Sequence, residues 1–403
     1  MLGRRVSKHW RGAVLFIVVL MLGSGTRYVL LGLPENNLAS LDAQIQLVGT
    51  SAEVKLPFSQ ALREGWSIQG GPPVPFPFAF INGILPPLVM SHNGTFALSA
   101  SILMLLLLLV PNQVRLNSGL VIAVILAVWA LTWESSYALF VLGVGFVGVL
   151  VAWKERQSWQ NVWQTELLKQ LGIPVLLSLF LVSIQGGVFT EIIRKSIFDA
   201  SGAGIGVEGE VSGLGFGLRW PLAIVSSHFS PLDLSNPGEV VVGLLELGPV
   251  IFFVPLTTIW IMKRGNQSLP EQPVLEVIVW SAWIGFLLPI FFKYQADRDI
   301  TRFSGHALTV WLLLLTWMLC VPKERHHNLV RIFGFSCLGL SIFGGGVVLM
   351  TEMMAYFKSK NHDSTHTTPT PKPHPCQTAR PKIALSPLFC AICFIATTET
   401  WPL

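Results

Sequence analysis

Long apolar runs that are almost free of charged residues recur along this chain. Two of them, "SAWIGFLLPIFF" and "FSGHALTVWLLLLTWMLC", lie on either side of the charged decapeptide "KYQADRDITR" at 293–302. Only 12% of the 403 residues are charged, whereas 52% are hydrophobic. A soluble protein of this length could not cover its surface with so little charge. The sequence therefore predicts an all-α protein, a polytopic transmembrane helix bundle.

Nine stretches are long and apolar enough to be interpreted as spans, since about 17–20 helical residues cross the hydrocarbon core of a bilayer. After Tyr356 the composition becomes polar and rich in proline, which is typical of a disordered segment. We therefore expect a transmembrane domain over 1–356 and a disordered tail over 357–403. The nine predicted spans lie near 12–32, 95–110, 118–133, 136–153, 171–188, 239–262, 274–292, 303–321 and 331–350.

The basic residues predict the orientation of these spans through the positive-inside rule. The basic N-terminus and an uncleaved first span place the start of the chain in the cytoplasm. Alternation then puts the short basic loops on the cytoplasmic side, with the decapeptide as the exception. The opposite face receives the loops 33–94 and 189–238, the turn "TWESS" at 132–136 and the decapeptide.

Several other functions are not supported by the sequence. The net charge of +5 comes from Lys and Arg at the ends of apolar runs, not from one basic stripe, so we expect no nucleic-acid partner. The glycine-rich stretch "ASGAGIGVEGEVSGLGFGLRW" lacks the spacing of a nucleotide-binding loop. The "CAIC" at 390–393 has no adjoining strand and helix that would make it a redox motif.

Two carboxylates on the predicted outer face are candidate catalytic residues. Asp42 follows the first span, and Glu134 lies in the tight turn between two short apolar runs. A carboxylate held over a membrane cavity could act as a general base towards an acceptor hydroxyl. Two simpler interpretations stay open, because Asp42 could cap a helix that begins at Ala43 and Glu134 could be an ordinary turn residue.

The decapeptide carries candidate phosphate-binding residues. Arg298 and Arg302 are four residues apart and would share a face of a helix. Together with Lys293 they could clamp a phosphate, because a planar guanidinium engages two phosphate oxygens at once. The alternative is an internal ladder with Asp297 and Asp299 that stiffens the start of the next span.

Two further outer segments could contribute to a site. In "LRWPLAIVSSHFSPLDL", Arg219 and His228 could line a polar pocket, with Arg219 as another phosphate contact and His228, Asp297 and Asp299 as supporting residues. The segment 70–90 contains six prolines and cannot form one straight transmembrane helix. It is either an interfacial or re-entrant segment or an aromatic anchor at the membrane surface.

With its outward carboxylates, "ALTWESSYALF", the glycine-rich outer loop and "DRDITRF", the chain resembles the GT-C superfamily of polytopic glycosyltransferases. More narrowly, residues 10–350 resemble uncharacterised bacterial membrane proteins of that superfamily. The resemblance implies a multi-span enzyme of the bacterial inner membrane. Such an enzyme takes a sugar from a polyprenyl-phosphate carrier and attaches it to an acceptor on the extracytoplasmic face.

The resemblance also implies roles and partners. The family's acidic residue would fall on Asp42 and its phosphate-contacting basic residue on Arg298 or Arg302. The implied partners are membrane lipids and the lipid-linked sugar donor. No cofactor is certain, and a divalent cation stays open. The chain departs from the family pattern because Asp42 lacks an adjacent acidic residue and no soluble outer domain follows the last span.

Two other functional classes compete with an enzyme. A noncatalytic membrane subunit would need no more than the low charge and the aromatic belts. A transporter or flippase of a lipid-linked solute would need ionisable residues within its spans and broken helices. The chief ionisable residues inside the predicted spans are Arg27, Glu246 and Glu276.

Overall fold

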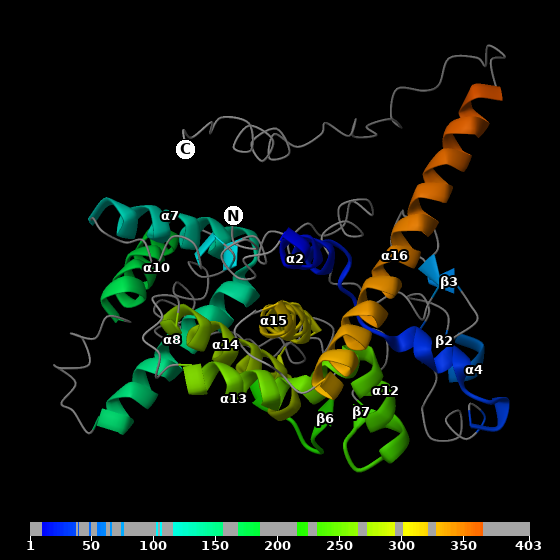
Figure 1. The fold of residues 1–403 in the computed structure, drawn as a ribbon, viewed down its shortest axis with the longest axis horizontal. Helices are drawn as coiled ribbons and strands as arrows, with labels where there is room; N and C mark the ends of the chain where they lie inside the picture. The colour runs from blue at the N-terminus through cyan, green and yellow to red at the C-terminus, as the bar shows by residue number, and fades with distance from the viewer. Residues whose placement is uncertain are drawn as a thin grey trace, which may run out of the picture. The chain divides into compact units, whose positions relative to one another are not determined.

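A computed structural model describes residues 10–37, 39, 48–49, 55–61, 65–66, 74–75, 102–103, 105–106, 116–155, 168–185, 216–224, 232–264, 272–294, 301–320 and 328–365. The chain divides into two compact units, Met1–Tyr356 and Phe357–Leu403. The described residues are mostly helical (Figure 1).

The helical elements are α2 (Trp10–Leu22), η1 (Arg27–Gly32), α4 (Phe58–Ala61), α7 (Leu116–Thr132), α8 (Glu134–Glu155), η4 (Leu168–Gly172), α10 (Ile173–Gln185), α12 (Pro237–Leu247), η6 (Pro249–Phe253), α13 (Val254–Arg264), α14 (Gln272–Phe291), α15 (Thr301–Cys320) and α16 (Asn328–Thr365). Eight short strands form four antiparallel pairs, which are β1 (Val48–Gly49) with β2 (Lys55–Leu56), β3 (Gly65–Trp66) with β4 (Val74–Pro75), β5 (Phe216–Leu218) with β8 (Phe292–Tyr294), and β6 (Ala223–Ile224) with β7 (Leu232–Asp233).

Four of the described helices are long and apolar enough to cross a membrane. Their spans are Glu134–Trp153, Val274–Phe291, Phe303–Cys320 and Asn328–Thr351. A fifth span is present if the bent pair of α12 with η6 and α13 crosses as one unit. The structure confirms the prediction of a mostly helical fold with several helices of membrane-spanning length, whereas the count of nine spans stays a prediction.

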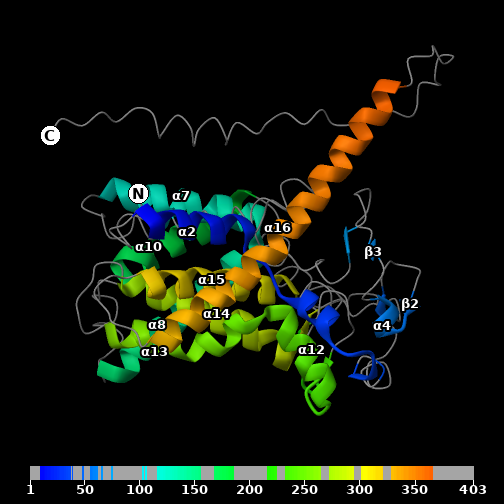
Figure 2. The same cartoon turned by 45° about the vertical axis from the view of Figure 1, so that its right-hand side comes forward.

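Helix α15 forms the centre of the bundle. It packs against α2, α8, α13 and α14 (Figures 1 and 2), and 89% of its span is buried. Its Trp311 is fully buried, and the indole ring lies 6.0 Å from the ring of Trp283 and 5.2 Å from that of Phe286, both on α14. Such tilted aromatic pairs fill a large volume with favourable edge-to-face contacts.

Helix α14 runs antiparallel to both α8 and α15, and it approaches each of them closely at glycines. A Cβ atom added at Gly143 of α8 would lie 2.7 Å from the carbonyl oxygen of Val277 on α14. One added at Gly285 of α14 would lie 2.9 Å from Leu139 of α8 and 2.9 Å from the carbonyl oxygen of Phe303 on α15. Side-chain-free positions of this kind let backbones come together where no hydrophobic effect drives helices together.

Two helical segments are interrupted, and their breaks meet. Helix α2 ends at Leu22, and the chain resumes as the 3-10 helix η1 at Arg27. Helix α12 ends before Gly248, whose φ of +85° is unfavourable for any other residue, and Pro249 follows. The hydroxyl of Thr26 in the first break donates to the carbonyl of Leu245 beside the second, at 3.2 Å.

Helix α16 packs on the first break through small residues. Ser24 donates its hydroxyl hydrogen bond to the Ser341 carbonyl at 2.8 Å, and Tyr28 donates to the Leu340 carbonyl at 2.7 Å. A side chain at Gly345 would overlap the Leu22 carbonyl, whereas Gly346 has nothing within 4 Å of its added Cβ. The break in α2 is therefore fixed by direct backbone contact with α16.

We expect Gly345→Ala to destabilise the protein by about 1–3 kcal/mol, because a methyl group there meets a backbone carbonyl that cannot rotate away. The measurement is thermal unfolding of the purified protein in detergent. Gly346→Ala is the matched control and should leave stability unchanged or raise it slightly. Equal midpoints for the two variants would contradict the close contact.

Candidate functional site

The antiparallel packing brings several predicted site residues to one end of the bundle. Because Leu139 of α8 contacts α14 at Gly285, and Gly285 lies beside Phe303, the start of α8, the end of α14 and the start of α15 lie together. We call this region, formed by Glu134, 291–294 and 301–302, the charged end. It contains the predicted carboxylate Glu134 and the backbone positions of Lys293 and Arg302.

A two-stranded ladder joins the charged end to a distant part of the chain. Strand β5 pairs with β8, with Gly217 opposite Lys293 and Leu218 opposite Phe292. The ladder continues at Arg219, whose backbone nitrogen donates to the Phe291 carbonyl at 2.8 Å. The end of the predicted outer loop 189–238 is therefore fastened to the start of the decapeptide.

Arg219 closes the C-terminal end of α14. Its side chain is only 3% exposed, and its Nε donates to the carbonyl of Pro289 at 3.0 Å. The last carbonyls of a helix lack helical donors, and a cation near them is favoured by the helix dipole. These contacts explain why an arginine is buried here. A phosphate contact through the rest of its guanidinium stays a prediction.

Glu134 occupies the first position of α8, and Trp133 alone separates that helix from α7. The residue is partly buried. A carboxylate in the first turn of a helix is stabilised by the backbone N–H groups and the helix dipole. The position holds a negative charge at the charged end, and it is compatible with both interpretations of Glu134.

A buried histidine lies one turn further into the bundle, and it was not among the predicted site residues. His306 of α15 is 2% exposed, and its Nε2 lies 3.2 Å from the hydroxyl of Ser281 on α14. The Ser281 hydroxyl also donates to the Ile278 carbonyl of its own helix, at 2.8 Å. The signal in the sequence is a titratable residue within an apolar span, in "FSGHALTV".

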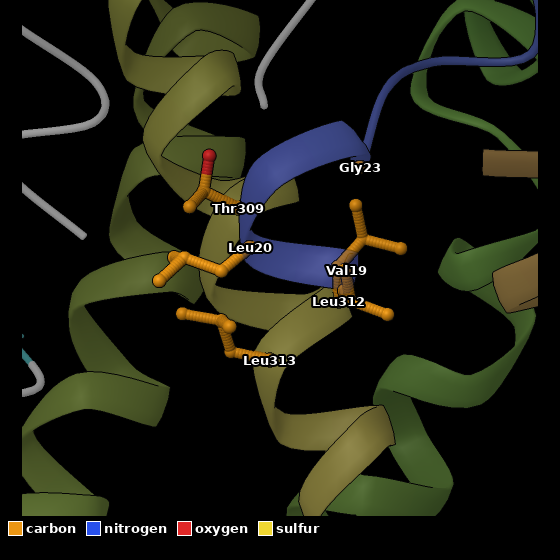
Figure 3. A pocket seen from close by; sticks show the side chains of 6 residues that line it. All are labelled: Val19, Leu20, Gly23, Thr309, Leu312 and Leu313. Atoms are coloured by element: carbon orange, nitrogen blue, oxygen red, sulfur yellow. The ribbon is translucent and has the colours of Figure 1, made fainter. Parts of the chain in front are cut away.

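Two small cavities beside α15 do not have the character of a substrate site. One of about 10 Å³ lies between α2 and α15 (Figure 3), and Val19, Leu20, Gly23, Thr309, Leu312 and Leu313 line it. Another of about 20 Å³ shares Leu313 and includes Phe16 and Trp317. Each has room for about one water molecule but lacks the polar partners that would hold it.

The other predicted site residues lie outside the described residues. These are Asp42, His228, Asp297, Arg298 and Asp299, and only the backbone is described for Lys293 and Arg302. Within the described parts of the chain, no group of three His, Cys, Asp or Glu residues is placed to hold a metal ion.

No protein-family model, curated protein or solved structure matches this chain.

We expect Arg219→Met to lower the stability of the protein by about 1.5–3 kcal/mol, because it removes a charge-assisted hydrogen bond from the end of α14. Thermal unfolding in detergent measures the loss. Ser235→Ala, at an exposed serine of the neighbouring turn, is the control and should behave as the wild type. An unchanged midpoint for Arg219→Met would show that the cap contributes nothing.

Proposed function

We propose that this protein is a membrane glycosyltransferase of the GT-C type. It transfers a sugar from a polyprenyl-phosphate carrier to an acceptor at the extracytoplasmic face of a bacterial inner membrane, with its N-terminus in the cytoplasm. The observation that carries the proposal is the ladder between β5 and β8. It joins Arg219 to the start of the decapeptide at the same end of the bundle as Glu134.

In the proposed reaction the acceptor hydroxyl attacks the anomeric carbon of the donor sugar. The bond between that carbon and the phosphate oxygen breaks, and the polyprenyl phosphate leaves with the bonding electron pair. A carboxylate, Glu134 or Asp42, takes the proton of the acceptor hydroxyl. Positive charge from Lys293, Arg298 and Arg302 stabilises the departing phosphate.

The arrangement of charge supports this division of roles. A carboxylate at the start of one helix and basic residues beyond the end of an antiparallel neighbour lie at the same end, although 159 residues separate Glu134 from Lys293 in the sequence. A transferase needs a base for the acceptor and cations for the leaving group at one place. The charged end combines the two kinds of residue beside membrane-length helices.

The test uses purified protein in nanodiscs with radiolabelled polyprenyl-phosphate mannose and polyprenyl-phosphate glucose. We expect Lys293→Ala to weaken donor binding by about 10–100-fold, the loss of one charge-assisted phosphate contact. Glu134→Gln should bind the donor normally and transfer about 10²–10⁴-fold more slowly if this residue is the base. Asp42→Asn distinguishes the second candidate base in the same way.

Lys263→Ala is the control for the loss of a positive charge, because Lys263 is an exposed lysine near the end of α13. It should bind and transfer as the wild type does. Wild-type protein that binds neither donor would overturn the proposal. Unchanged donor binding by Lys293→Ala would overturn the assignment of the charged end.

A second candidate, a transporter of an anionic solute, is favoured by the two interrupted segments. Breaks in paired transmembrane helices are typical of substrate sites in transporters. Here the breaks meet through Thr26 and Leu245, and the neighbouring Arg27 is wholly buried. A buried cation between broken helices would suit a negatively charged group.

The transporter candidate predicts that proteoliposomes containing the protein move a lipid-linked substrate from one leaflet of the bilayer to the other. Lipid-linked sugar phosphate, fluorescently labelled and placed in one leaflet, should reach the other leaflet faster than in protein-free vesicles. Arg27→Gln should reduce this rate by about tenfold or more, the loss of one favourable charge contact. Arg331→Gln, at an exposed arginine of α16, is the control. Equal rates with and without the protein would exclude the transporter.

A further inference from the structure

The strand β5 and the residues after it have two unlike faces. Leu218 is 79% exposed and Trp220 is 84% exposed, whereas Arg219 between them is 3% exposed. The buried arginine is therefore turned into the protein, and large apolar groups lie on the outside on both sides of it. A neighbouring tryptophan and leucine that are both this exposed are unusual for a surface in water.

The apolar side continues directly from a membrane span. Leu218 pairs with Phe292 in the ladder, and Phe291 and Phe292 are themselves exposed at the end of α14. Phe291 is the last residue of the span Val274–Phe291. We call Leu218, Trp220 and Phe292 the apolar ladder face.

The position of this face identifies its partner. A span that ends at Phe291 brings the ladder of β5 and β8 to the boundary between hydrocarbon and lipid headgroups. Tryptophan is enriched at that depth, where its ring has both apolar and polar contacts. Exposed apolar side chains that continue from a lipid-facing helix are covered by the same lipid. The side chain of Arg219, between Leu218 and Trp220, is turned inward.

We infer that the apolar ladder face is inserted among the acyl chains at the membrane interface. The ladder of β5 and β8 then lies on the bilayer and does not project into the water. The backbone of Lys293 follows at the level of the lipid phosphates, so a phosphate held there reaches the charged end from the lipid side. This inference concerns the contact with lipid and holds whether or not the protein transfers sugar.

Depth-dependent quenching tests the insertion. An environment-sensitive dye is attached through Leu218→Cys or Trp220→Cys in a chain whose five native cysteines are changed to alanine. The protein is reconstituted in vesicles of phosphatidylcholine and phosphatidylglycerol, with acyl chains brominated below the headgroup. We expect brominated lipid to quench both labels several-fold more than aqueous iodide does.

Two reference positions calibrate the measurement. Leu142→Cys places the dye on an exposed residue in the middle of the span of α8, where only lipid should quench it. Ser235→Cys places it in the polar turn before α12, where iodide should quench it. The labels at 218 and 220 should resemble the one at 142.

Two results would overturn the inference. Quenching by iodide at 218 and 220, as at 235, would place the apolar ladder face in water. Protection from both quenchers would mean that protein, such as a second copy of the chain, covers the face. If the cysteine variants do not fold, Trp220→Phe in the wild-type chain gives the same information. Bromolipid should quench the emission that this variant loses, and emission quenched by iodide alone would contradict insertion.

Discussion

The close approach of α8, α14 and α15 at Gly143 and Gly285 is the contact on which the rest of the described bundle depends. Both glycines face backbone carbonyl oxygens of a neighbouring helix, so the helices are in register at two points. Within a bilayer, helices associate through packing and not through exclusion of water. The register set by these glycines is what brings the start of α8, the end of α14 and the start of α15 to one level, and the charged end exists because of it.

Several hydroxyl groups inside the bundle are satisfied by hydrogen bonds within their own helix. Thr309 and Thr316 of α15 donate to the carbonyls four residues earlier, at 2.9 and 2.7 Å. Such bonds remove the cost of a hydroxyl in an apolar environment. Other polar groups, Arg219 and His306 among them, form hydrogen bonds to a neighbouring element. Arg219 reaches from a strand to the end of α14, and His306 reaches across to Ser281.

The sequence was informative where structure follows from composition. The predicted spans at 136–153, 274–292 and 303–321 correspond to α8, α14 and α15, because an apolar run of that length has few other stable states. It was less informative about breaks. The prediction of one span over 239–262 meets a 90° bend, which the pair Gly248 and Pro249 could have indicated. The pairing of β5 with β8 had no signal in the sequence, since three residues of strand are too few to form a pattern and four helical elements lie between the two strands.

The bend at Gly248 has a consequence for how the protein is assembled. The helices α12 and α13 have 11 residues each, which gives each a length of about 16 Å, roughly half the thickness of the hydrocarbon core. Neither is long enough to be retained by the bilayer as an independent span. Helix α13 packs on α14 and α15, which are synthesised after it. The packing of α13 is therefore completed only after α14 and α15 have been synthesised.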